Sequence, residues 1–162
     1  MTKELLDALA VFVQGATSHF SLPTAVQPGD TEQVFRAPEI HKMRLPDSTS
    51  YKKIAPYIIV RYLSSKDEQP QGERIRSSAT VELIFCVHNP DEEEGALDLV
   101  NLIDAVRFRL LREAVIGGKY EVDLGKVETI VYPDEVGQYY GGEIIFNVEC
   151  PPIEREVDWN AI

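Results

Sequence analysis

Cys86 and His88 form the arrangement in this sequence that most resembles a nucleophile with its base. A cysteine nucleophile needs a base within hydrogen-bonding reach, and histidine is the usual one. Residues two apart on a strand share a face of the sheet, but their tips do not meet in the geometry of a catalytic triad. The pair therefore does not predict a catalytic site.

The two cysteines, Cys86 and Cys150, are too few for a disulfide scaffold and lack the CxxC spacing of a metal or redox site. We expect both to be small buried thiols, free of any disulfide.

Metal and phosphate chemistry are not predicted either. The three histidines, His19, His41 and His88, have no HxxxH or HExxH spacing. The acidic run 91–94 would attract a divalent ion, yet at the start of a helix it caps the chain and complements the helix dipole. The stretch "IGGK" at 116–119 follows a helix instead of preceding one, so it lacks the amides that cradle phosphate. We expect its glycines to cap that helix. No catalytic residue, cofactor site or metal site is predicted.

The elements around these residues alternate in type. Residues 1–16 have the apolar spacing of a helix, and 55–88 contain two β-rich runs joined by a polar turn. The most regular helical pattern of the chain follows, from Asn89 to Glu113, and 120–150 form a second pair of strands. This order, helix, hairpin, helix, hairpin, predicts an α+β fold in which an antiparallel sheet of about four strands carries both helices on one face. We predict a single domain over residues 1–162 with its core at 55–150.

Two segments lie outside this core. Residues 20–53 contain four prolines and few periodic apolar positions, which predicts a long extended arm with at most a short strand near Val34 and Phe35. After Pro151 and Pro152 the chain is expected to leave the sheet as an extended tail, 151–162, that carries Trp159. We expect arm and tail to become ordered only on assembly.

The helix within 89–113 has more apolar surface than one sheet can cover. Its sheet-facing stripe is predicted to contain Ala96, Leu99, Ile103, Val106 and Leu110. Leu97 and Phe108 lie together roughly 100° or more away, beside Asp104. This second face requires a second partner, either another subunit or the arm of the same chain. The candidate subunit interface comprises Leu97, Asp104, Phe108, Arg36, Arg44 and Trp159.

The charge balance of 16 Lys and Arg against 27 Asp and Glu gives a formal net charge of −11. This charge repels a phosphate backbone, so specific nucleic-acid binding is not expected. The negative charge fits either a surface that DNA passes without binding or ordinary solubility. From Arg36 to Lys53 cations outnumber acids, which fits either a clasp on a neighbouring copy or a solvated loop. No signal peptide or membrane span is recognised, so we expect a soluble protein that stays where it is made.

The order of elements, with "APYIIVRY", "ATVELIFCVHNPDEEEGALDLVNLIDAVRFRLL", "KYEVDLGKVETIVYPDE" and "GGEIIFNVECPPIERE", resembles the tail terminator and minor tail proteins of long-tailed bacteriophages. The resemblance covers about residues 55–156. It implies a small α/β virion subunit that forms a hexameric ring on the tail tube, stops its polymerisation and meets the head connector. Tail tube and connector proteins would be its partners, and no catalytic residue or cofactor is implied.

Three other functions remain open from the sequence. The long arm at 20–53 is also compatible with another phage neck or minor tail subunit. A non-viral homo-oligomeric scaffold would have a similar topology. The alternative of another class is a small cytosolic enzyme that uses Cys86 or the acidic cluster.

Overall fold

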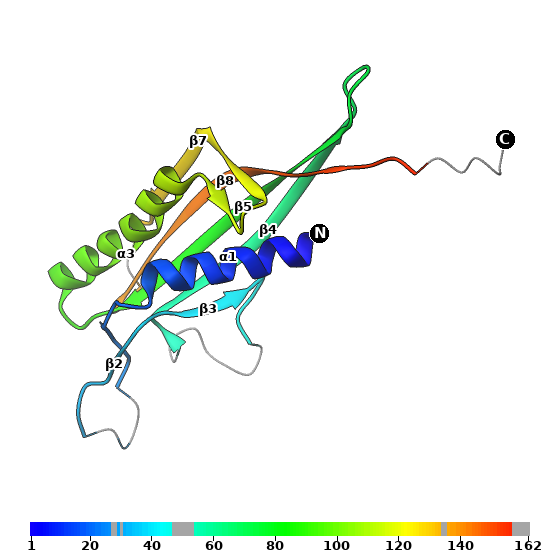
Figure 1. Ribbon diagram of the computed structural model, residues 1–162. Coiled ribbons are helices and arrows are strands. Elements are labelled where there is room, and N and C mark those ends of the chain that lie inside the picture. The colour runs from blue at the N-terminus through cyan, green and yellow to red at the C-terminus, as the bar shows by residue number, and fades with distance from the viewer. Residues whose placement is uncertain (27–28, 30, 47–53, 134–135, 157–162) are drawn as a thin grey trace.

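The computed structural model describes residues 1–26, 29, 31–46, 54–133 and 136–156. Two long helices, α1 (Thr2–Thr17) and α3 (Glu92–Glu113), lie against one face of a long, curved sheet (Figure 1). The principal strands are β4 (Tyr57–Glu68), β5 (Ile75–His88), β7 (Tyr120–Val131) and β8 (Tyr139–Ile153), and the shorter ones are β1 (Leu22–Pro23), β2 (Phe35–Arg36), β3 (Glu39–Lys42) and β6 (Val115–Ile116). The predicted α+β class is confirmed.

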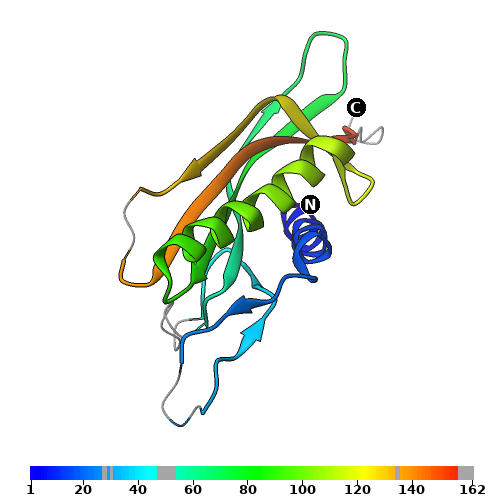
Figure 2. The same cartoon turned by 90° about the vertical axis from the view of Figure 1, so that its left-hand side faces the viewer.

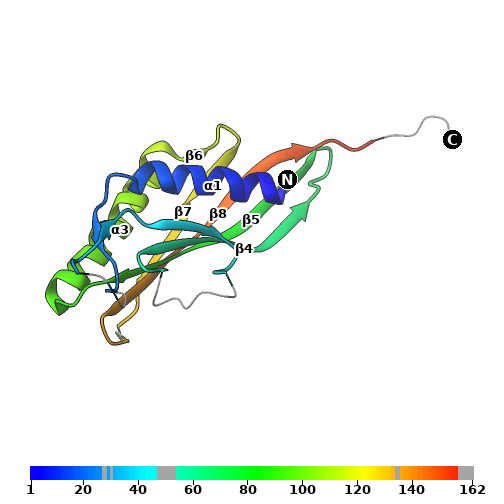
Figure 3. The same ribbon diagram turned by 90° about the horizontal axis from the view of Figure 1, so that it is seen from below.

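The main sheet has six strands in the order β3-β4-β5-β8-β7-β6, so the expectation of about four strands was too low. All neighbours are antiparallel except β3 and β4, which run parallel. Viewed from below in Figure 3 and from the side in Figure 2, α1 and α3 occupy the same side of the sheet. Helix α1 packs on β3 and β4, whereas α3 packs on β5, β8 and β7.

The core lies between the sheet and the two helices. The alternating residues Val81, Leu83, Phe85 and Val87 of β5 are completely buried there, because every second side chain of a strand points to the same face. A smaller apolar cluster on the opposite face contains Ala55, Tyr57, Ile59 and Cys86. The sheet is therefore apolar on both faces at this end, and α1 and α3 both cover the same one.

The predicted arm is partly built into the sheet. Strand β3 pairs in parallel with Tyr57–Val60, and β1 and β2 form a separate two-stranded sheet. Leu22 and Pro38 are buried against the body. The short strand expected near Val34 and Phe35 is β2. The described residues of 20–53 are extended, as predicted, and pair within the chain because β4 offers them an open edge. That they become ordered only on assembly stays a prediction.

The predicted exit from the sheet at Pro151 was wrong. Strand β8 continues to Ile153, which pairs with Ile75, while the pairing with β7 stops at Glu149. The register shifts between the Cys150 and Ile153 pairs, so Pro151 and Pro152 lie in an irregular step. Proline is tolerated at such a step because no regular ladder hydrogen bond is required of it.

The ends of α3 show one confirmed and one wrong prediction. The side chain of Asp91 accepts hydrogen bonds from the backbone N–H groups of Glu93 and Glu94, so the acidic run does cap the helix. The C-terminal cap is Ala114, with a φ of 59°, and not the glycines of "IGGK". Gly117 and Gly118, both at positive φ, form the turn between β6 and β7.

Candidate functional site

Helix α3 has a buried face that matches the sequence prediction at four of five positions. Leu99, Ile103, Val106 and Leu110 are buried, and Leu102 joins them. Ala96 is exposed, so its assignment to the sheet-facing stripe was wrong. Gly95 occupies the inward position of the first turn, where an added Cβ would lie 2.3 Å from Cε2 of the buried Tyr140. The Tyr140 ring thus fills the space that an inward side chain would need.

The outer face of α3 carries a stripe of exposed apolar side chains. Leu97 and Phe108 are 51% and 47% exposed, as their positions on the helical wheel predicted. Val100 and Leu111 are exposed beside them. At 100° per residue these four residues fall within about 80° of the circumference, and the stripe is roughly 21 Å long. They form two pairs, Leu97 with Val100 and Phe108 with Leu111, on either side of Asp104. Exposed apolar residues are ordinary when single, but a group of them on one face indicates a contact surface.

A groove of about 510 Å³ extends this surface from α3 onto the end of β7. Its walls include Val100 of α3 and the segment Val131, Tyr132 and Pro133. Val131 and Tyr132 are themselves exposed large apolar side chains. We call this surface the α3–β7 face; it comprises Leu97, Val100, Phe108, Leu111, Val131, Tyr132 and Pro133.

The charges around the α3–β7 face are unevenly distributed. Asp104 pairs with Arg107 at 3.3 Å, and the Arg107 guanidinium lies 4.7 Å from the centroid of the Phe108 ring. The segment 91–104 contains six acids and no lysine or arginine. The first half of α3 is therefore acidic, whereas two arginines of its second half are paired, Arg107 with Asp104 and Arg109 with Glu113.

The arm of the same chain was the alternative partner for Leu97 and Phe108. The described residues of the arm form β1, β2 and β3, and β3 pairs with β4. They leave the Leu97 and Phe108 side chains about half exposed. Helix α1 approaches α3 from the other flank, where the Arg109 guanidinium lies 4.9 Å from the centroid of the Phe12 ring. In the part of the chain that the structure describes, nothing of the subunit itself covers the outer stripe.

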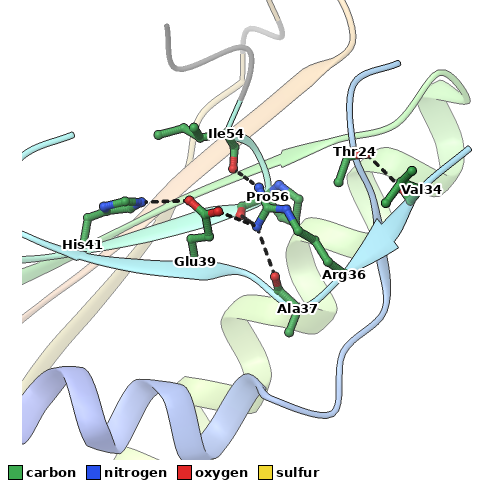
Figure 4. Close-up of polar contacts among 8 residues, drawn as sticks. All are labelled: Thr24, Val34, Arg36, Ala37, Glu39, His41, Ile54 and Pro56. Atoms are coloured by element: carbon green, nitrogen blue, oxygen red, sulfur yellow. Dashed lines mark hydrogen bonds and ion pairs between the residues drawn. The ribbon is translucent and has the colours of Figure 1, made fainter. Parts of the chain in front are cut away.

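Arg36 serves the subunit's own fold. Its guanidinium donates hydrogen bonds to the carbonyl oxygens of Ala37 (3.2 Å), Pro56 (3.0 Å) and Ile54, as Figure 4 shows. Its Nη1 lies 3.8 Å from Glu39, whose carboxylate also contacts His41 at 3.2 Å. The planar guanidinium thereby ties the start of β3 to the start of β4.

We expect Arg36→Lys to lower the free energy of unfolding by about 1–2 kcal/mol, because a lysine cannot make several directed bonds in one plane. Urea unfolding is the measurement, and Arg112→Lys, at an exposed position on α3, is the matched control. Equal stability of the two variants would contradict the role assigned to Arg36.

The other predicted interface residues are dispersed. Arg44 is exposed just beyond β3, and its backbone N–H donates to the carbonyl oxygen of Lys42 at 2.8 Å. It lies beyond the opposite edge of the sheet from the α3–β7 face. Trp159 lies outside the described residues. The structure therefore brings Leu97, Asp104 and Phe108 together and places Arg36 and Arg44 elsewhere.

The surroundings of Cys86 and His88 do not favour nucleophilic catalysis. Burial raises the pKa of the Cys86 thiol to about 11, although a hydrogen bond with Tyr57 acts to lower it. The pKa of His88 is lowered by burial, and its Nε2 contacts Gln138 at 3.1 Å. A catalytic cysteine requires a lowered pKa in an accessible place. Both cysteines are free and buried, as predicted.

We expect native-state thiol labelling at pH 8 to be slow at Cys86, and both thiols to react at once in denaturant. Because the pKa of Cys86 in the folded protein lies above the ordinary value of 9.0, the protonated thiol stabilises the folded state below pH 9. That contribution is lost as the pH rises from 9 through 11. A thiol-specific chromophore measures the labelling rates. Rapid labelling of the native Cys150→Ser variant, in which Cys86 is the remaining thiol, would contradict the prediction. Rapid labelling of the native Cys86→Ser variant, at Cys150, would not.

The sequence interpretation missed five residues of the α3–β7 face. Val100 and Leu111 share a wheel sector with Leu97, so the helical period could have found them. Val131 is the last residue of β7, and Tyr132 and Pro133 follow it. No local pattern shows which helix a strand end will meet.

Searches among known protein families and among curated proteins found no match to this chain. Among the described residues, no three His, Cys, Asp or Glu side chains are arranged to hold a metal ion. Neither helix in the described part of the chain is long and apolar enough to cross a membrane.

Proposed function

We propose that this protein is a structural subunit of a long-tailed bacteriophage virion, of the tail terminator type. It forms a ring on the end of the tail tube, stops tube polymerisation and joins the tail to the head connector. Its role is one of assembly, without a catalytic step or a cofactor. The finished protein is located in the virion tail after assembly in the host cytoplasm.

The observation that carries this proposal is the uncovered apolar stripe of α3. A subunit that functions alone gains nothing from a leucine and a phenylalanine held half exposed on one line of a helix. A ring subunit needs such a surface at every junction. The order of elements resembles that of tail terminators and supplies the class of assembly.

The charge of the chain supports the same role. A net charge of −11 does not favour tight binding to DNA, yet DNA must pass through a terminator ring during ejection. An acidic subunit allows that passage without retaining the phosphate backbone. Tail tube and connector proteins are therefore the proposed partners, along with further copies of the chain.

Deletion of the gene from the phage or prophage that carries it tests the proposal. We expect tail tubes of uncontrolled length in electron micrographs of the lysate, and restoration of normal tails by a plasmid copy. The gene itself should lie just before that of the major tail tube protein. Normal tails after deletion, or a gene surrounded by no virion genes, would overturn the proposal.

A further inference from the structure

Strand β7 forms the border of the sheet beside α3. Strand β6 pairs only with Tyr120 and Glu121 of β7, and the N–H group of Val122 donates to the carbonyl oxygen of Ala114 at 2.7 Å. Beyond this point β7 pairs with β8 on one side, and no further strand of the described chain lies on the other (Figure 2). We call residues 127–131, with the sequence VETIV, the β7 edge.

The backbone of the β7 edge has hydrogen-bonding groups that point outward. The N–H group of Tyr132 donates to the carbonyl oxygen of Gly141 at 2.9 Å, so these two residues form a hydrogen-bonded pair of the antiparallel ladder. Hydrogen-bonded pairs occur at every second position of such a ladder, and the pairing with β8 therefore uses Glu128 and Ile130. The intervening residues direct their N–H and C=O groups away from β8; they are Val127, Thr129 and Val131. Within the described residues, these outward groups have no hydrogen-bond partner.

The β7 edge lacks the features that usually protect a free edge. Such edges are blunted by bulges, lysines, prolines or short length. In the first half of β7 the register with β8 shifts between Val122 and Val127, and Lys126 lies in this step. Strand β3, at the opposite border, has only four residues. The β7 edge is regular and contains β-branched residues at every position except Glu128, so it can accept a further strand.

The side of the β7 edge that faces the helices is apolar and uncovered. Thr129 pairs with the completely buried Ile144, which places Val127, Thr129 and Val131 on the helix side. Val131 is nevertheless 48% exposed, because the groove of about 510 Å³ separates it from Val100 of α3. A strand paired with the β7 edge would direct every second side chain towards this groove. Apolar side chains at those positions would extend the core.

The charges around the β7 edge are negative. Glu92 lines the groove, and Glu93 follows it on α3. Glu128 lies in the middle of the edge and points to the opposite side of the sheet, because its neighbour Thr129 faces the helices. All three are exposed, and in the part of the chain that the structure describes none of them has an ion-pair partner. Lysine or arginine next to Glu128 would form an opposite-charge pair across the ladder.

We propose that the β7 edge binds an extended segment of another protein in which apolar residues alternate with lysine or arginine. The apolar side chains face α3, and the cations lie beside Glu128. The free segments of this chain do not have that charge, since 154–162 contain three acids and one arginine, and 24–34 contain two acids and no cation. The partner is therefore a different chain. The contact does not involve Phe108 and does not depend on the phage role.

A synthetic peptide of nine residues, with lysine and valine in alternation, is the probe. We expect it to bind with a Kd below roughly 100 µM and to slow hydrogen exchange at the amides of Val127, Thr129 and Val131, measured by nuclear magnetic resonance. The same peptide with glutamate in place of lysine is the control and should bind about 3- to 10-fold more weakly. Equal binding of the two peptides would overturn the charge assignment, and absence of binding would overturn the site.

Thr129→Pro removes one outward N–H group of the β7 edge. Because this group does not bond to β8, the subunit is expected to fold, and circular dichroism checks this. Binding of the lysine peptide should weaken at least about 10-fold. Thr129→Val, which keeps the N–H group, is the matched control and should bind as the wild type does. Unchanged binding to a folded Thr129→Pro protein would overturn the proposed strand pairing.

Methylated peptides test the same pairing on the wild-type protein. One peptide carries N-methyl groups on its lysine residues and the other on its valine residues. Only one of the two sets of amides can face β7, so one peptide should lose binding and the other should retain it. Equal binding of both would overturn the strand pairing.

Sedimentation velocity separates a foreign partner from a second copy. Self-association that Thr129→Pro abolishes would show that the β7 edge joins copies of this chain, and would overturn the assignment to another protein. Normal tails after deletion of the gene would remove the phage role and leave the peptide contact intact. Loss of peptide binding in a protein whose deletion alters the tails would have the opposite meaning.

Discussion

Phe108→Asp is expected to yield a folded monomer in place of a ring. The Phe108 side chain is about half exposed and contacts the guanidinium of Arg107, so the new carboxylate stays in water beside a cation and the core is unaffected. At a subunit junction the same carboxylate would be removed from water. Without the buried phenyl ring, each junction would lose roughly 1.5–3 kcal/mol of binding free energy, and the cost of burying a charge would add to that loss.

Circular dichroism and sedimentation together measure this outcome. The far-ultraviolet spectrum should equal that of the wild type while the oligomer disappears. Phe108→Tyr, which keeps the ring and adds an exposed hydroxyl, is the matched control and should still assemble. A Phe108→Asp protein that is unfolded, or one that still forms rings, would show that this face has another role.

Ile103→Asp is expected to unfold the subunit. Ile103 is 1% exposed on the buried side of α3, and its Cδ1 would lie 2.8 Å from a Cβ added at Gly142 of β8. A carboxylate there would have neither a cation nor water. Leaving an uncompensated charge in a core costs about 3–5 kcal/mol, which is comparable with the total stability of about 5–15 kcal/mol of a typical domain.

Val100→Asp, three residues earlier on the same helix but exposed, is the control for Ile103→Asp. It introduces the same charge and the same loss of helix propensity without burial. Urea unfolding should show a stable Val100→Asp protein and an Ile103→Asp protein with no cooperative transition. Two variants of equal stability would contradict the assignment of the two faces of α3.

The elements with a clear period were predictable from the sequence. The alternation of β5 gave the bounds Ile75–His88, and the apolar spacing of α3 separated Ile103 from Phe108 correctly. These patterns are local, because a residue's own neighbours on the element determine which face it joins.

The elements without a period were not predictable. Strand β3 has four residues and exists because β4 offers it a parallel edge eighteen positions further along the chain. The passage of β8 through Pro151 and Pro152 depends on an irregular step in its pairing with β5. Both are decided by tertiary contacts, which a local pattern does not contain.

The residues of the α3–β7 face were likewise predictable only where they lie on a periodic element. Leu97 and Phe108 were found on the helical wheel, whereas Val131 and Tyr132 joined them only when the sheet placed the end of β7 beside α3. The role of Arg36 within the subunit was missed for the same reason. The carbonyl groups that it contacts at Ile54 and Pro56 lie on another segment of the chain.

The most direct test of a ring-forming subunit is sedimentation velocity of the wild-type protein over a range of concentrations. Subunits that close into a ring should form one oligomer of fixed size, in equilibrium with monomer and with few intermediates. A protein that remains a monomer up to roughly 100 µM, where any junction would be weaker than about −5.5 kcal/mol, would contradict a ring-forming role. So would a protein that forms only open chains whose size grows steadily with concentration.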